Sequence, residues 1–238
     1  NLGNRESLKG YFAAVTAMDL DIGRILDRLE KLGLREDTLV VFSSDNGFSC
    51  GHHGFWGKGN GTFPLNMYEN SVKVPLIFSH PGRLPQGAVT DALTSGYDLV
   101  PTLLEYLGLP GIDDEKLPGR SFLPALRGEG DCGRESVVVY SEYGPTRMLR
   151  TREWKYVHRY PYGPHELYDL VNDPDERHNL AHHPEQAGRI REMRQGLAEW
   201  FARYLDPPMD GKGLPVTGGG HHSRITPTNA GENSFYEL

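Results

Sequence analysis

The fold is decided by the stretch TLVVFSSDNGFSCGHHGFWGK, which occupies residues 38–58. Its beginning, residues 38–43, is rich in β-branched and apolar side chains and predicts a buried strand. Asp45 and Asn46 follow where this strand ends, and ligands of open α/β sheets gather at the carboxyl ends of strands. A carboxylate beside an amide carbonyl offers the hard oxygen ligands that Ca²⁺ or Mg²⁺ prefers. Because Lys58 adds a compact positive charge for an oxyanion, the stretch predicts half of a site for a sulfate or phosphate ester.

The same stretch resembles the second half of a sulfatase of the alkaline-phosphatase-like superfamily. That family has a strand, an Asp-Asn-Gly or Asp-His-Gly triplet, a short Gly-His-Gly loop and then an aromatic-x-Lys. Here these are Asp45-Asn46-Gly47, His53-Gly54 and Trp56-Gly57-Lys58, in that order. Further blocks match at Tyr68-Glu69 and at residues 74–77, 81–82, 98–102, 104, 166–170, 173–174 and 179–180, so the resemblance extends to about residue 205.

The resemblance implies a role for each of four residues. Asp45 is expected to bind the cation and to lie against the nucleophile, and Asn46 to give its side-chain oxygen to the same ion. The resemblance implies that the ion is Ca²⁺, with Mg²⁺ as the alternative. Lys58 is expected beside the sulfate oxygens, where it stabilises charge that develops on the ester oxygen. His53 holds the family's histidine position and is expected either to act in the site or to stabilise its loop.

The nucleophile motif of the family does not occur in its expected context. Sulfatases use a formylglycine made from Cys or Ser in Cys/Ser-x-Pro-x-Arg, close to a pair of metal-binding aspartates. Residues 79–83 fit this spacing literally, but they follow an apolar strand and contain the turn signal Pro81-Gly82. Asp19 and Asp21 lie about 200° apart around a predicted helix and cannot face one cation. We therefore expect the C-terminal portion of a longer enzyme, inactive alone, whose N-terminal part supplies the formylglycine.

Composition restricts the partners. The 238 residues carry a net charge of −7 and have a pI near 5.8, which argues against a broad surface for nucleic acid or anionic membranes. No apolar run is long enough to span a bilayer. The expected ligand is a sulfate-ester small molecule or a sulfated glycan. The location that the resemblance implies is periplasmic, secreted or lysosomal, and the sequence does not choose among these.

The order of patterns predicts an α/β part followed by an α+β subdomain. Residues 1–128 are expected to be the C-terminal part of an α/β catalytic domain, with helices at 11–32 and 98–107 and buried strands at 38–43 and 74–78. Asp98 is expected to cap the N-terminus of the second helix. Residues 134–205 follow as a small antiparallel sheet with a helix at 184–204, and residues 206–238 as an extended tail. The whole is interpreted as part of an alkaline-phosphatase-like sandwich followed by the α+β subdomain.

Three functions remain open from the sequence. The first is a metal-dependent sulfuric ester hydrolase. The second is a phosphodiesterase or phosphonate monoester hydrolase of the same superfamily, which shares the metal and lysine layout but often carries Asp-His-Gly, so that Asn46 favours the sulfatase. The third is an inactive module that binds sulfated glycans, which an acidic chain without a basic stripe disfavours. The carboxylates of Asp169, Asp173 and Asp175 are interpreted as turn and capping groups.

Overall fold

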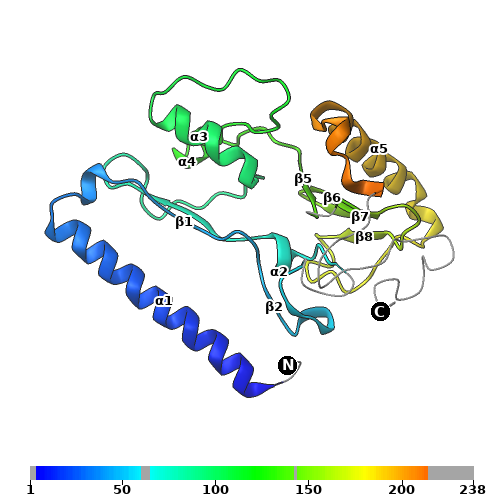
Figure 1. The fold of residues 1–238 in the computed structure, drawn as a ribbon, viewed down its shortest axis with the longest axis horizontal. Helices are drawn as coiled ribbons and strands as arrows, with labels where there is room; N and C mark the ends of the chain where they lie inside the picture. The colour runs from blue at the N-terminus through cyan, green and yellow to red at the C-terminus, as the bar shows by residue number, and fades with distance from the viewer. Residues whose placement is uncertain (1–3, 60–64, 142–143, 214–238) are drawn as a thin grey trace.

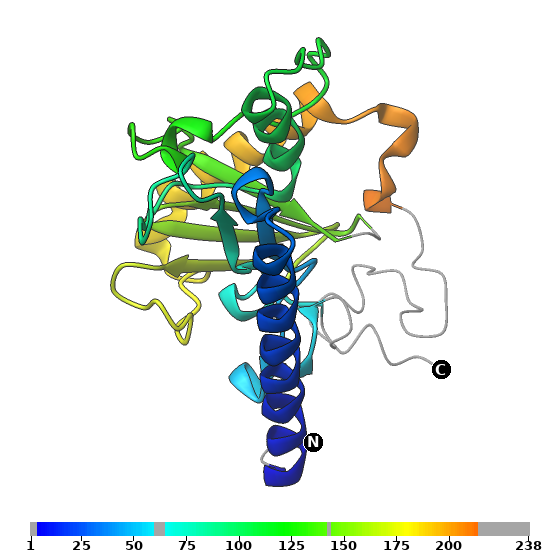
Figure 2. The same cartoon turned by 90° about the vertical axis from the view of Figure 1, so that its left-hand side faces the viewer.

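The structure is a computed structural model, and it describes residues 4–59, 65–141 and 144–213 (Figure 1). The first element is the long helix α1 (Arg5–Lys31), whose N-terminus is capped by the Asn4 side chain. It ends before Gly33, which has a φ of 67°. The predicted helix is confirmed and begins earlier than expected. Its apolar stripe is uncovered in the described chain, since Phe12 is 59% and Ile25 61% exposed, and Figure 2 shows α1 projecting beyond the other elements.

The two predicted strands of the α/β part pair with each other. Strand β1 (Val40–Ser43) and strand β4 (Leu76–Ser79) run antiparallel, with Val40 opposite Ser79 and Ser43 opposite Leu76. Burial on both faces was expected and is not what this chain shows. Exposure alternates along β1, and in β4 only Ile77 is exposed. Val41 is 41% and Ile77 56% exposed, because no described element covers that face.

Short elements connect this pair to the rest of the chain. Strands β2 (Ser49–Cys50) and β3 (Trp56–Gly57) form a small antiparallel ladder around the 3-10 turn η2 (His52–Gly54). The helix α2 (Glu69–Val72) follows. The 3-10 turns η1 (Arg35–Asp37) and η4 (Gly96–Asp98) and the helices α3 (Leu99–Tyr106) and α4 (Leu123–Leu126) complete the first part.

Asp98 does not cap α3 through its side chain, which corrects the sequence interpretation. Its carboxylate instead accepts from the backbone N–H of Ser95 at 2.9 Å and of Arg120 at 2.8 Å, and it pairs with the guanidinium of Arg134. Asp98 is 1% exposed, and burial raises the pKa of its carboxyl group although these donors oppose the shift. The residue therefore anchors the start of α3 to the chain that precedes the second sheet.

The second part is a four-stranded antiparallel sheet, as predicted. Strands β5 (Ser136–Tyr140), β6 (Thr146–Thr151), β7 (Trp154–Arg159) and β8 (Glu166–Asp169) pair in sequence order. The turn η5 (Pro184–Gln186) leads into α5 (Ala187–Tyr204), and the turns η6 (Pro207–Met209) and η7 (Gly211–Gly213) end the described chain. The rest of the predicted tail, residues 214–238, lies outside the described residues.

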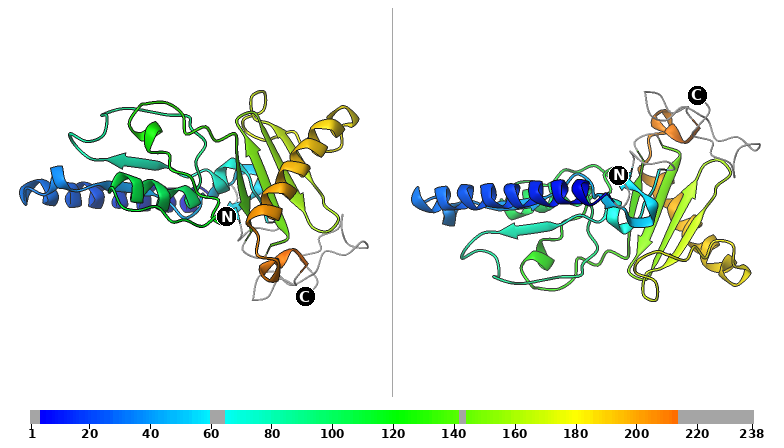
Figure 3. Two further views of the ribbon diagram at one scale, coloured as in Figure 1. Left: turned by 90° about the horizontal axis from the view of Figure 1, so that it is seen from above. Right: turned by 90° about the horizontal axis from the view of Figure 1, so that it is seen from below.

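Different layers cover the two faces of this sheet. Helix α5 crosses one face (Figure 3), and the core between them consists of Val138, Leu149, Tyr156, Leu167, Met193, Leu197 and Phe201. On the other face Met67 packs against Met148 and Val157, with Val72 beside them. The segment that holds Met67 comes from the first part of the chain, so the sheet joins the two parts. No helix among the described residues has the length and apolar character needed to cross a membrane.

Candidate functional site

The β2–β3 ladder brings the predicted site residues to one end of a hairpin. Ser49 pairs with Gly57 and Cys50 with Trp56, so the chain that enters β2 from Asn46 lies beside the chain that leaves β3 at Lys58. At the other end, the backbone N–H of Gly51 donates to the carbonyl oxygen of Phe55 at 2.8 Å and closes the loop. Asn46 stands three residues before β2 and Lys58 directly after β3, so both flank the open end of the hairpin.

A second segment holds both sides of this hairpin end. We call residues 65–72 the bridging segment. The backbone N–H of Gly47 donates to the carbonyl oxygen of Ser71 at 2.9 Å, and the N–H of Asn66 donates to that of Gly59 at 3.1 Å. A Cβ on Gly47 would lie 2.0 Å from the Asn70 carbonyl oxygen, and one on Gly59 would lie 2.6 Å from that of Asn66. Both glycines are needed for this close approach, and each adjoins a predicted site residue.

Asp45, Asn46 and Lys58 occupy the accessible edge of this arrangement. Asp45 and Lys58 are exposed and Asn46 is half-buried. Asp45 and Asn46 follow β1, and Lys58 comes directly after β3. The Ser44 hydroxyl donates to the carbonyl oxygen of Asn46 at 2.7 Å and lies 3.4 Å from Asp45 Oδ1, which tightens the turn. The three predicted residues therefore follow the ends of β1 and β3, and the side chains of Asp45 and Lys58 are exposed.

His53 lies on the side of the hairpin that faces the second part of the chain. Its ring stacks on Tyr68 of the bridging segment, with centroids 3.7 Å apart and an interplanar angle of 5°. Its φ of 54° is a left-handed conformation, which is uncommon outside glycine. Burial and then His52 lower the pKa of His53, against the pull of Asp173 and Asp175. The loop therefore holds the imidazole in a stacked position on a left-handed backbone, in surroundings that favour its neutral form.

The donor set suits a hard cation in type but not in number. Asp45 and Asn46 offer one carboxylate and one amide oxygen, whereas Ca²⁺ takes six to eight oxygen ligands and Mg²⁺ six. Within residues 4–59, 65–141 and 144–213, no three His, Cys, Asp or Glu side chains are grouped so as to hold a metal ion. A cation at Asp45 and Asn46 needs further ligands.

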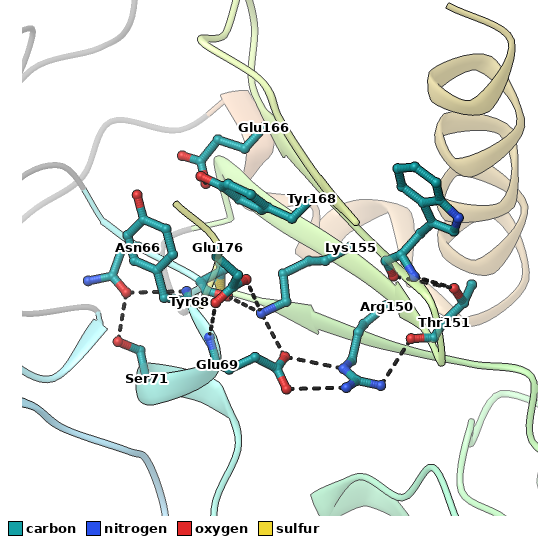
Figure 4. Close-up of polar contacts among 12 residues, drawn as sticks. Asn66, Tyr68, Glu69, Ser71, Arg150, Thr151, Lys155, Glu166, Tyr168 and Glu176 are labelled. Atoms are coloured by element: carbon teal, nitrogen blue, oxygen red, sulfur yellow. Dashed lines mark hydrogen bonds and ion pairs between the residues drawn. The ribbon is translucent and has the colours of Figure 1, made fainter. Parts of the chain in front are cut away.

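The sequence did not signal the ion-pair cluster beneath the bridging segment (Figure 4). Lys155 of β7 is fully buried, and its Nζ lies 2.7 Å from Glu69 Oε1 and 2.6 Å from Glu176 Oε1. Arg150 contacts both carboxylate oxygens of Glu69 at 3.2 Å. Tyr68-Glu69 was matched as a family block, but a lysine in a strand carries no sequence pattern that distinguishes it from a solvated one.

The three aspartates at positions 169, 173 and 175 are engaged in local structure. Asp169 accepts from the backbone N–H groups of Val171 and Asn172, both at 3.1 Å, and Asp173 accepts from that of His178 at 2.8 Å, so the turn interpretation is confirmed for these two. Asp175 forms a surface ion pair with Arg177.

Comparison with known proteins identifies the family. Residues 51–203 match the family profile described as N-sulphoglucosamine sulphohydrolase, C-terminal. The chain belongs to the sulfatase family. An N-acetylglucosamine-6-O-sulfatase of Bacteroides thetaiotaomicron is 32% identical over 219 residues, which cover 87% of this chain and 38% of that sulfatase. The chain therefore spans about two fifths of the length of this relative.

Solved structures of relatives confirm the fold. The chain superposes with a TM-score of 0.73 and 33% identity on a protein in complex with its substrate D-glucosamine-2-N,6-O-disulfate, over 84% of this chain and 41% of that one. A phosphonate monoester hydrolase of Agrobacterium radiobacter gives a TM-score of 0.70 at 28% identity, over 82% of this chain and 41% of that one. The predicted fold class, an alkaline-phosphatase-like α/β part followed by an α+β subdomain, is confirmed.

Proposed function

We propose that the complete enzyme is a sulfuric ester hydrolase that acts on a sulfated sugar, and that this chain contributes Asp45, Asn46 and Lys58 to its active site. One observation carries the proposal, namely that a sulfatase-family chain holds these three residues at one accessible end of a strand and hairpin. The sugar follows from the relatives, because an N-acetylglucosamine-6-O-sulfatase and a protein bound to a glucosamine disulfate are both similar to this chain.

Asp45 and Asn46 would hold a divalent cation, Ca²⁺ or else Mg²⁺. Their oxygen donors fit that chemistry, and the remaining ligands would come from outside the described residues. When bound, such an ion acts as a Lewis acid and a template for the sulfate group. A formylglycine, supplied by a part of the enzyme that this chain does not include, would be the nucleophile.

Lys58 would act on the charge of the ester. Its ammonium group is exposed beside the hairpin end, where it can approach the sulfate oxygens. A positive charge held there stabilises the negative charge that grows on the leaving oxygen more than it stabilises the bound ester. His53 would help to shape the site, since its ring is stacked on Tyr68 of the bridging segment.

A phosphonate monoester hydrolase is the second candidate. The neighbour from Agrobacterium radiobacter has this activity in its name and shares the fold at 28% identity. A divalent cation, a carboxylate and a lysine can promote hydrolysis of phosphorus esters as well as of sulfate esters. This half of the site therefore does not distinguish the two activities.

The test is a comparison of three esters with one purified preparation of the complete enzyme. The rate of sulfate release from 4-nitrophenyl sulfate and from a 6-O-sulfated glucosamine should exceed the rate of hydrolysis of a phenyl phosphonate ester at equal concentration. Preference for the phosphonate ester would support the second candidate instead. Binding of the sulfated sugar without hydrolysis of any ester would leave only an inactive binding module.

A further inference from the structure

One face of strand β7 is directed at the bridging segment. Alternate residues of a strand share a face, and Lys155, Val157 and Arg159 are such a set. Lys155 Nζ donates to the carbonyl oxygen of Met67 at 3.0 Å, Val157 packs against the Met67 side chain, and Arg159 donates to the carbonyl oxygen of Leu65 at 2.6 Å. The strand thus binds the backbone of the segment at two points and its side chain at a third.

The charge of Lys155 is satisfied wholly inside the protein. The side chain is 0% exposed, and its ammonium group contacts the Met67 carbonyl together with Glu69 and Glu176. Glu176 also accepts from the backbone N–H of Glu69 at 2.6 Å, so the two carboxylates and the lysine fix the start of α2 from both sides (Figure 4). Removing a buried charge from such a group leaves its partners unpaired and displaces them.

The two carboxylates respond differently to this environment. Burial alone raises the pKa of Glu69, but Lys155 and Arg150 outweigh it and hold that pKa below its usual value. Burial raises the pKa of Glu176 in spite of the same lysine. The surroundings therefore favour the charged form of Glu69 more than that of Glu176. Glu69 ties Lys155 of β7 to the bridging segment, and its pairing with Arg150 attaches β6 as well.

The other side of the bridging segment contacts the candidate site. Ser71 accepts from Gly47, next to Asn46, and Asn66 donates to Gly59, next to Lys58. Tyr68 stacks on His53. His53 therefore contacts the segment, and Asn46 and Lys58 each adjoin a glycine that does, while β7 holds the segment from the other side.

We propose that Lys155, assisted by Arg159 and Glu69, is a positioning residue for the active site: it holds the bridging segment, and the segment sets the separation of Asn46 from Lys58. The proposal rests on the proposed function, in which Asn46 and Lys58 belong to the active site. The α+β subdomain then contributes to the chemistry of the α/β part through the bridging segment.

The test compares Lys155→Met with Arg134→Met in the complete enzyme. Met keeps most of the apolar stem and removes the charge in both variants. Arg134 is the matched control because it is also buried and paired with an aspartate, Asp98, which adjoins α3 on the side of the molecule opposite to β2 in Figure 1. Both variants should lower Tm, by on the order of 10 °C for a broken buried pair.

The two variants should differ in readouts that stability alone does not move. At a temperature well below both transitions, Lys155→Met should lower kcat by on the order of 10²-fold, as expected of a displacement near 1 Å, with a small change in KM. Its Gly47 and Asn66 amides should exchange hydrogen faster. Arg134→Met should keep kcat within about threefold, because substitutions at distant sites act nearly independently. The partners of Arg134, Asp98 and Pro118, lie outside the bridging segment, so both amides should stay protected.

A second variant separates folding from positioning. In Lys155→Met/Glu176→Gln one unpaired carboxylate is removed and Glu69 keeps Arg150, so Tm should recover in part while the loss of kcat and of amide protection remains. Recovery of kcat together with Tm would overturn the proposal, and so would unchanged exchange at Gly47 and Asn66 in Lys155→Met. The exchange measurement needs no substrate, so it decides the positioning role even if the enzyme proves not to cleave sulfate esters.

Discussion

Gly47 and Ser71 are joined by a 2.9 Å hydrogen bond from the N–H of the glycine to the carbonyl oxygen of the serine. The bond brings the turn after β1 against the bridging segment so closely that no side chain fits at residue 47. The adjoining Asn46 is thereby set in place by backbone contacts.

Gly47→Ala should destabilise the protein and displace Asn46. The new Cβ would lie 2.0 Å from the Asn70 carbonyl oxygen, and overpacking of this kind costs about 1–3 kcal/mol. Gly10→Ala is the control, because a Cβ there meets open space and alanine favours the helix. Thermal unfolding of the two variants measures the difference. A Gly47→Ala protein as stable as the wild type would show that the backbones can separate freely.

Lys58→Ala should lower kcat of the complete enzyme by on the order of 10²–10³-fold and change KM little, because its charge acts mainly in the transition state. Steady-state kinetics on 4-nitrophenyl sulfate measure both constants. Lys31→Ala, which removes an exposed lysine at the end of α1, is the control and should leave both unchanged. Near wild-type kcat in Lys58→Ala would remove Lys58 from the site.

Asp45→Ala should lose the divalent cation together with activity, since a methyl group cannot replace an anionic ligand. Asn46→Ala should be milder, because water can take a neutral ligand's position. Elemental analysis of each variant, with Ca²⁺ and Mg²⁺ supplied separately, measures the bound metal, which should be lower in Asp45→Ala than in Asn46→Ala. Equal metal content in Asp45→Ala and the wild type would exclude Asp45 as a ligand.

Acid should destabilise the second sheet through His158. This histidine is 3% exposed, and burial, helped by His165, Arg194 and Arg147, lowers its pKa to about 3. The unfolded chain binds a proton below about pH 6.5 and the folded one does not. The stabilisation is therefore complete above that pH and is lost as the pH falls towards 3, at up to about 1.4 kcal/mol per pH unit.

His158→Gln should flatten this acid limb, since an amide oxygen can still accept from Tyr156, whose hydroxyl lies 2.8 Å from His158 Nδ1. Tm measured from pH 3.5 to 7.5 should fall less steeply in this variant than in the wild type. His178→Gln, at an exposed position, should follow the wild-type curve. Parallel curves for all three proteins would show that another group causes the acid limb.

The 238-residue chain alone should associate in solution. Apolar side chains on α1 and on the β1–β4 pair are 40–61% exposed, including Val15, Leu20, Ile25 and Ile77. Exposed apolar surface and uncovered strand faces favour self-association. Size-exclusion chromatography with light scattering should detect oligomers, whereas the complete enzyme should not form them. A monodisperse monomer with a cooperative thermal transition would contradict this expectation.

Local patterns were enough for the elements and for the residues of the candidate site. The stripe of α1, the short strands of the second sheet and the order of Asp45, Asn46 and Lys58 are periodicities or short-range patterns, which depend on neighbours along the chain. The pattern was insufficient for Asp98, where the side chain bonds to Ser95 and Arg134 in place of capping α3, because its partners come from different segments.

The sequence by itself determined the family, the element order and the residues predicted for the site after β1 and β3. Only the tertiary structure decided what holds them there. Lys155 and Met67 are 88 residues apart, and a lysine is stable in the interior only where distant carboxylates and carbonyls converge on its charge. That convergence depends on how the second sheet packs on the bridging segment, which no local pattern in β7 specifies.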